Sequence, residues 1–122
     1  MPWELDSDRP IYAQIVDRLK HEIVSGFYPP GSRLPSVREL AAQASVNPNT
    51  MQKAFTELER TGLIVTRRTS GRTVTEDTAL IEQVRSELAE LQISQFLTRM
   101  QHLGYQKDDS IRLLLAKKEE IS

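Results

Sequence analysis

Five polar side chains cluster near the middle of the chain: Asn47, Asn49, Thr50, Gln52 and Lys53. The amides of Asn and Gln can each form two hydrogen bonds with adenine, and Lys or Thr can meet a guanine edge or a phosphate. The same residue types also cap helices or face solvent. For Asn47 we favour helix capping. For Asn49 and Gln52 we favour contact with a nucleic-acid groove, only because the predicted elements around them form a helix-turn-helix.

Arg38 is a second candidate, because it falls two residues after the expected N-cap of a helix, Ser36. The helix dipole disfavours a cation at this end. A phosphate nearby would offset the penalty and use the same helix N-terminus. An ion pair with Glu39 or with a more distant carboxylate is the alternative.

Three further arginines, Arg67, Arg68 and Arg72, lie in a short segment with the sequence Arg-Arg-Thr-Ser-Gly-Arg. This segment separates two runs rich in β-branched residues, 63–66 and 73–75, and the pattern predicts a β-hairpin with a basic tip. Such a tip can reach phosphates or a minor groove. A charged hairpin can also serve only to protect a sheet edge from pairing.

The charge of the chain is unevenly distributed, although its net value is only −1. Residues 33–72 carry seven basic and three acidic side chains, a net charge of +4, whereas residues 1–32 carry −2 and residues 73–122 carry −3. A basic middle between acidic ends favours a surface that meets a polyanion. Solvated surface charge is the simpler interpretation, and this charge alone does not exclude it.

Helical periodicity and capping signals predict the elements that position these residues. Apolar residues spaced as in a helix follow Pro10 and end at Gly26, and a rigid Pro-rich loop precedes Ser36. Ser36 and Glu39 form a capping box at the start of a second helix, which is amphipathic. Asn47 and Pro48 begin a third helix, which ends near Gly62. This order predicts a winged helix-turn-helix, in which the third helix enters a DNA major groove.

The composition changes after Thr75, where one long helix is expected to run to Leu103 and a short one to follow Asp108. The long helix carries two apolar stripes, which one short helix cannot cover, so we expect them to form a dimer interface. The candidate interface residues are Ile81, Val84, Leu88, Leu91, Phe96 and Met100. The predicted fold is therefore mainly α with a small β-hairpin: a winged helix-turn-helix DNA-binding domain over 1–75 and a two-helix dimerisation tail over 76–122.

Many spaced positions between residues 10 and 75 together resemble the DNA-binding domain of the GntR family of bacterial transcription regulators. They include Pro10-Ile11-Tyr12, Leu34-Pro35-Ser36, Arg38, Asn49-Thr50, Leu58-Glu59, Gly62-Leu63-Ile64 and Gly71. The short helical tail resembles the YtrA-like subfamily, whose members are dimeric repressors. The resemblance implies that Arg38 contacts a phosphate and that Gly71 allows close approach in the minor groove. It also implies contacts with bases and phosphates from Asn47, Pro48, Asn49, Thr50 and Gln52.

Other classes of protein are disfavoured. There is no cysteine, the two histidines stand isolated, and no nucleotide-binding or nucleophile motif is present, so we expect no catalysis, cofactor or metal. No apolar run is long enough for a membrane, and we expect a cytoplasmic protein. The expected partners are a double-stranded DNA operator and a second copy of the chain; the sequence identifies no small-molecule effector. The alternative is a winged helix that binds a partner protein instead of specific DNA.

Overall fold

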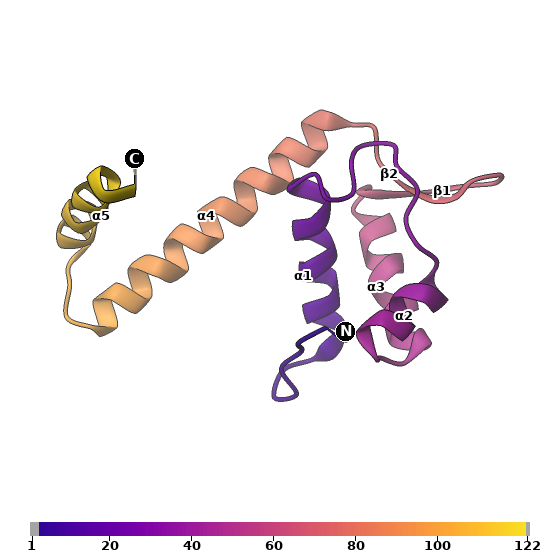
Figure 1. The fold of residues 1–122 in the computed structure, drawn as a ribbon, viewed down its shortest axis with the longest axis horizontal. Coiled ribbons are helices and arrows are strands. Elements are labelled where there is room, and N and C mark those ends of the chain that lie inside the picture. The colour runs from indigo at the N-terminus through magenta and orange to yellow at the C-terminus, as the bar shows by residue number, and fades with distance from the viewer. Residues whose placement is uncertain (1–2, 122) are drawn as a thin grey trace. The chain divides into compact units, whose positions relative to one another are not determined.

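The chain forms helices and one antiparallel hairpin, in a computed structural model that describes residues 3–121 (Figure 1). The elements are α1 (Ile11–Val24), α2 (Val37–Ala44), α3 (Pro48–Arg60), β1 (Ile64–Arg67), β2 (Gly71–Val74), α4 (Thr78–His102) and α5 (Lys107–Ile121). The predicted fold class, mainly α with a small hairpin, is confirmed. The chain divides into an N-terminal unit, Met1–Arg85, and a C-terminal unit, Ser86–Ser122.

Helices α1 and α3 pack side by side and form most of the core of the N-terminal unit (Figure 1). Each buries one apolar stripe at helical spacing, as the periodicity predicts. From α1 the buried residues are Ile15, Val16, Leu19, Ile23 and Val24, and from α3 they are Met51, Ala54, Phe55 and Leu58. Because the inner side of α3 is fully used in this packing, only its outer side is available for a ligand.

The predicted helix starts are confirmed at α2 and α3. The Ser36 side chain accepts a hydrogen bond from the Glu39 backbone N–H, and the Glu39 carboxylate accepts one from the Ser36 N–H, which completes a capping box. Between the two helices Ser45 adopts a left-handed conformation with φ 57°, which turns the chain sharply. Helices α2 and α3 with this turn form the helix-turn-helix.

The hairpin of β1 and β2 pairs Ile64 with Val74 at its base and Arg67 with Gly71 at its tip. The preceding loop also pairs with β2, because the Leu34 N–H donates to the Arg72 carbonyl and the Val74 N–H donates to the Ser32 carbonyl. The Pro-rich sequence of this segment predicts only a rigid loop. The extra pairing holds β2 from Val74 to Arg72 against this loop, and only the tip from Arg67 to Gly71 lies beyond it.

The first turns of α4 belong to the N-terminal unit. Asp77 caps the helix by accepting a hydrogen bond from the Leu80 N–H. Ile81 is only 4% exposed, and the Arg85 side chain donates to the Val24 carbonyl at the end of α1. These contacts place the limit of the compact unit ten residues beyond Thr75, the expected end of the DNA-binding domain.

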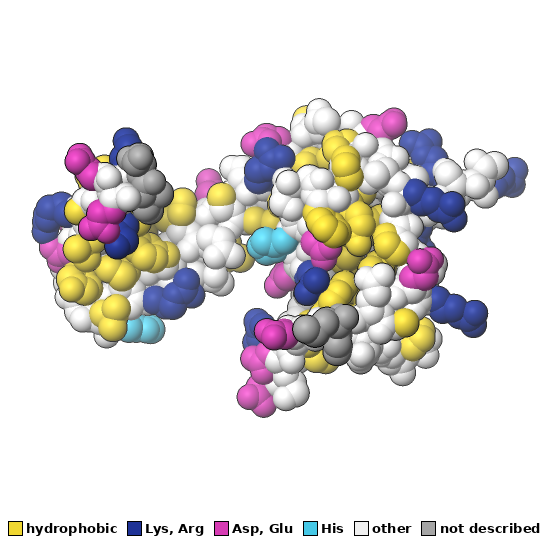
Figure 2. All heavy atoms as spheres, viewed as in Figure 1, with side chains coloured by type: hydrophobic (Ala, Val, Ile, Leu, Met, Phe, Trp, Pro, Cys, Tyr) yellow, Lys and Arg dark blue, Asp and Glu magenta, His cyan; other side chains and the backbone are white. Residues whose placement is uncertain are grey.

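The C-terminal unit contains the rest of α4 and α5. Helix α5 begins at Lys107, earlier than the expected start after Asp108, so the acidic pair lies in its first turn, where Asp109 accepts a hydrogen bond from the Gln106 N–H. Large apolar side chains remain exposed on both helices, and Figure 2 shows hydrophobic side chains gathered on a face of this unit. The exposed set is Leu91, Ile93, Leu103, Tyr105, Ile111, Leu113, Leu114 and Leu115.

Candidate nucleic-acid interface

The outer side of α3 presents polar side chains at its N-terminal half. Asn49, Gln52 and Lys53 are exposed, whereas Thr50 is half-buried. Asn47 is the N-cap, and its side-chain oxygen accepts a hydrogen bond of 2.8 Å from the Asn49 backbone N–H. Capping by Asn47, favoured from the sequence, is therefore confirmed. This cap orders the first turn of α3 and so fixes where the exposed side chains begin.

Most of the cations around this surface have no protein partner. No described residue forms an ion pair or hydrogen bond with the side chains of Arg33, Arg38, Lys53, Arg67 or Arg68. Figure 2 shows Lys and Arg side chains around the part of the N-terminal unit that carries α2 and the hairpin. These side chains are free to neutralise a polyanion without first breaking a contact within the protein.

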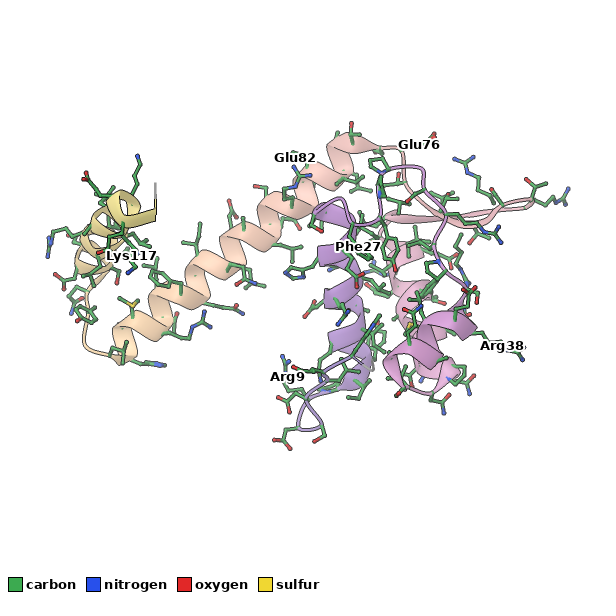
Figure 3. All side chains as sticks on the ribbon, in the orientation of Figure 1. Arg9, Phe27, Arg38, Glu76, Glu82 and Lys117 are labelled. Atoms are coloured by element: carbon green, nitrogen blue, oxygen red, sulfur yellow. The ribbon has the colours of Figure 1, made fainter. Side chains whose placement is uncertain are left out.

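Arg38 occupies the second position of α2, as expected, and its side chain is exposed. Figure 3 shows it directed away from the body of the unit at the end of α2. The alternative of an ion pair with Glu39 does not occur, because the Glu39 carboxylate is used in the capping box. Among the described residues, no ion pair or hydrogen bond holds the Arg38 side chain, which lies at the end of α2 where the helix dipole disfavours a cation.

An open hollow of about 680 Å³ connects the N-terminus of α2 with the hairpin. Ser36 and Val37 line it from α2, and Gly71 lines it from the hairpin, with Arg33 between them. Arg33 belongs to the basic middle of the chain, residues 33–72, and no sequence motif distinguishes it there. Its significance arises from the pairing of its segment with β2, which brings it beside the hairpin.

Gly71 begins β2 at the tip of the hairpin with φ +72°. A residue with a Cβ would be strained in this left-handed region. The nearest atom to a Cβ built there is the Arg33 Nε at 3.9 Å, so the protein itself leaves room for a side chain. The glycine is therefore required by the turn, and its bare surface is open to a ligand.

Arg72 differs from the other predicted contact cations, Arg38, Lys53 and Arg68, because it is already paired with a carboxylate. Its Nε donates to the Glu59 Oε1 at 2.8 Å, and its guanidinium lies 5.2 Å from the centroid of the Phe55 ring. Arg60 is paired as well, with Glu57, and this hydrogen bond lowers the pKa of the Glu57 carboxyl. Of the hairpin arginines, Arg67 and Arg68 are therefore the ones free to meet a nucleic acid.

The residues predicted to form the dimer fall into different environments. Ile81 is buried in the N-terminal unit and cannot also face a partner. Val84, Leu88, Phe96 and Met100 are half-buried, whereas Leu91 is 52% exposed. Ile81 therefore lies outside the candidate dimer surface, which extends instead to the exposed apolar residues of α5, Ile111, Leu114 and Leu115.

The described residues 3–121 contain no helix that is long and apolar enough to cross a membrane, and no group of three or more His, Asp or Glu that could hold a metal.

Comparisons with known proteins agree with this geometry. The model of the gntR family of bacterial regulatory proteins matches residues 11–74. The HTH-type transcriptional repressor YtrA of Bacillus subtilis is 41% identical over 100 residues, which cover 80% of this chain and 76% of YtrA. A GntR family transcriptional regulator from Listeria monocytogenes superposes with a TM-score of 0.82 at 42% identity, over 92% of this chain and 98% of that one.

A structure of AraR(DBD) in complex with operator ORX1 is also similar, with a TM-score of 0.52 and 28% identity over 62% of this chain and 92% of that one. The family match covers the helix-turn-helix and the hairpin, which are the elements that carry the exposed polar residues and the unpaired arginines. The resemblance expected from the sequence is confirmed. This chain belongs to the GntR family of bacterial regulatory proteins, which are transcription regulators rather than enzymes.

Proposed function

We propose that this transcription regulator is a dimeric repressor, which lies in the cytoplasm and binds a palindromic DNA operator there. Helix α3 enters the major groove, and Asn49, Gln52 and Lys53 read base edges, with Thr50 beside them. The observation that carries this proposal is the exposure of Asn49, Gln52 and Lys53 on the outer side of α3, whose inner side is buried. AraR, a similar protein, has been solved with an operator bound.

Arginines position the protein on the phosphate backbone in this proposal. Arg38 and Arg33 approach phosphates beside α2, and Arg68 brings the hairpin to the backbone at the minor groove, where Gly71 allows close approach. Support comes from the lack of a partner for Arg33, Arg38 and Arg68 among the described residues. A buried or paired arginine would have to lose a contact before it could bind a phosphate, whereas these three would not.

The exposed apolar residues of the C-terminal unit form the dimer interface in this proposal. Ile111, Leu114 and Leu115 lie on one side of α5 at helical spacing, and all three are exposed. A contiguous apolar surface of this kind is rare on a monomer that has no partner. A two-fold axis through this interface relates two copies of α3, which then match half-sites about 10 base pairs apart or a multiple of that distance.

The first test concerns Arg38. Arg38→Ala is expected to weaken binding to all DNA sequences by a similar factor, because a phosphate contact carries no sequence information. The slope of log K against log salt concentration should become shallower by about 0.9, the contribution of one neutralised phosphate. Fluorescence anisotropy on labelled duplexes at several salt concentrations measures both quantities. An unchanged slope would show that Arg38 does not lie on a phosphate.

The second test concerns base recognition by Asn49 and Gln52. Replacing either residue with Ala is expected to cost about 1–3 kcal/mol at particular base positions and to relax the preference there. Stability should change little, because both side chains are exposed. Selection of bound sequences from a random pool, run with wild type and each variant, compares the consensus directly. An identical consensus from all three proteins would exclude these residues as the readers.

A further inference from the structure

The Glu59 carboxylate connects α3 to both strands of the hairpin. Its Oε1 accepts a hydrogen bond of 2.8 Å from the Arg72 Nε on β2, and its Oε2 accepts one of 2.8 Å from the Thr66 hydroxyl on β1. Thr66 and Arg72 are direct partners in the hairpin register. One carboxylate on the last turn of α3 therefore holds both strands at the same position along the hairpin.

The Arg72 guanidinium is held on a second side by α3. Phe55 lies one turn before Glu59 on the same side of the helix, and its ring is 5.2 Å from the Arg72 Cζ. Phe55 is fully buried, so this ring cannot move to follow the arginine. The side chains of Arg72 and Glu59 are 26% and 30% exposed, and this partial burial strengthens a charge-assisted hydrogen bond relative to one in water.

The rest of the hairpin shows why this contact matters. Backbone pairing with residues 31–34 holds β2 from Val74 to Arg72, whereas residues 68–70 form a turn at the tip. A two-stranded hairpin with strands of this length is only marginally stable without support. The Glu59 contacts are the side-chain hydrogen bonds that join the hairpin to α3 among the described residues. They meet the hairpin at Thr66 and Arg72, where the backbone pairing with residues 31–34 ends, one residue pair before the tip.

We propose that Glu59 is a positioning residue, which holds Arg72 and Thr66 and thereby fixes the hairpin relative to α3. In this arrangement Arg72 holds the hairpin in position and does not contact DNA, in contrast to the expectation from the sequence. The inference rests on the proposed DNA binding. Its consequence is that α3 and the arginines at the hairpin tip meet the two grooves as one rigid body, so that less ordering is needed when DNA binds.

The test measures binding of the full-length protein to its selected operator at several salt concentrations. The variants are Glu59→Gln, Arg72→Met and the double variant, with Arg68→Met as the matched control at the hairpin tip. Glu59→Gln and Arg72→Met are each expected to weaken binding by about tenfold, as for loss of a charge-assisted hydrogen bond. The double variant should bind the operator with the same affinity as Arg72→Met alone, because the two residues act as a unit.

The salt dependence separates a positioning role from a phosphate contact. Arg72→Met should leave the salt slope unchanged, whereas Arg68→Met should make it shallower by about 0.9. Hydroxyl-radical footprinting should show that Glu59→Gln loses protection under the hairpin and keeps it under α3, a pattern that general destabilisation would not produce. A shallower slope for Arg72→Met, or tighter or unchanged binding by Glu59→Gln, would overturn the inference.

Two further outcomes are distinguishable. If wild type binds no selected DNA, the proposed function and this inference both fail. If wild type binds the selected DNA and Arg72→Met has a shallower salt slope than wild type, this inference alone is rejected. If Glu59→Gln does not fold, Thr66→Val replaces it, since this variant removes one hydroxyl and leaves the ion pair intact. Thr66→Val should then bind about threefold more weakly at an unchanged slope. Wild-type affinity in Thr66→Val would contradict the inference.

Discussion

Leu114→Glu is expected to convert the protein to a monomer at micromolar concentration and to weaken binding to the palindromic operator by at least about 100-fold. Leu114 is 52% exposed on the apolar side of α5. A two-fold interface would bury the new carboxylate twice without a partner, which is strongly unfavourable. The loss of affinity arises because each half-site must then be bound separately. Sedimentation velocity measures the first effect, and anisotropy measures the second.

Ala116→Glu is the matched control, because it adds the same charge to an exposed position of the same helix. Position 116 lies outside the stripe formed by Ile111, Leu114 and Leu115. This variant should remain a dimer with nearly wild-type affinity for the operator. Binding of Leu114→Glu to a single half-site should also match that of wild type, since the N-terminal unit is unchanged. A dimeric Leu114→Glu would reject α5 as part of the interface.

Ile81→Ala is expected to lower the free energy of unfolding of the N-terminal unit by about 2–5 kcal/mol, as for other large-to-small substitutions in a core. Ile81 is 4% exposed there, although it lies on the helix whose later turns form the C-terminal unit. Urea unfolding followed by fluorescence of Trp3, the single tryptophan, measures this unit selectively. The oligomeric state of the folded protein should not change.

Leu91→Ala is the matched control for Ile81→Ala, because Leu91 lies on the same helix and is exposed. The free energy of unfolding of the N-terminal unit should stay within about 0.5 kcal/mol of the wild-type value. The contrary result is that Ile81→Ala dissociates the dimer and leaves the free energy of unfolding of the N-terminal unit unchanged. That result would return Ile81 to the dimer interface, as the periodicity of the sequence alone predicts.

Features with short-range causes could be predicted from the sequence. The capping box of Ser36 and Glu39, and the cap of Asn47 before Pro48, depend on residues within three positions of each other. The buried stripe of α3 follows from a helical period that repeats over thirteen residues. Together with the hairpin pattern, these features predict the winged helix-turn-helix, whereas the family follows from the resemblance of many spaced positions between residues 10 and 75 and is confirmed by the family match.

Features that depend on distant partners could not be predicted in this way. Periodicity places Ile81 on an apolar stripe but does not say which surface covers it, and the covering surface is the N-terminal unit. Arg72 follows Gly71 in an evidently basic tip, yet its partner Glu59 is thirteen residues earlier, on a helix. Arg33 becomes notable only because its segment pairs with β2. In each case tertiary packing determines the environment.

Selection of bound DNA from a random pool, performed with the wild-type chain, tests the central claim most directly. The proposal predicts an enriched palindrome with half-site centres about 10 base pairs apart or a multiple of that distance. Two chains should bind each selected duplex, as measured by light scattering of the complex. Enrichment of no sequence, or of a single unrepeated site bound by one chain, would contradict operator recognition by a dimer.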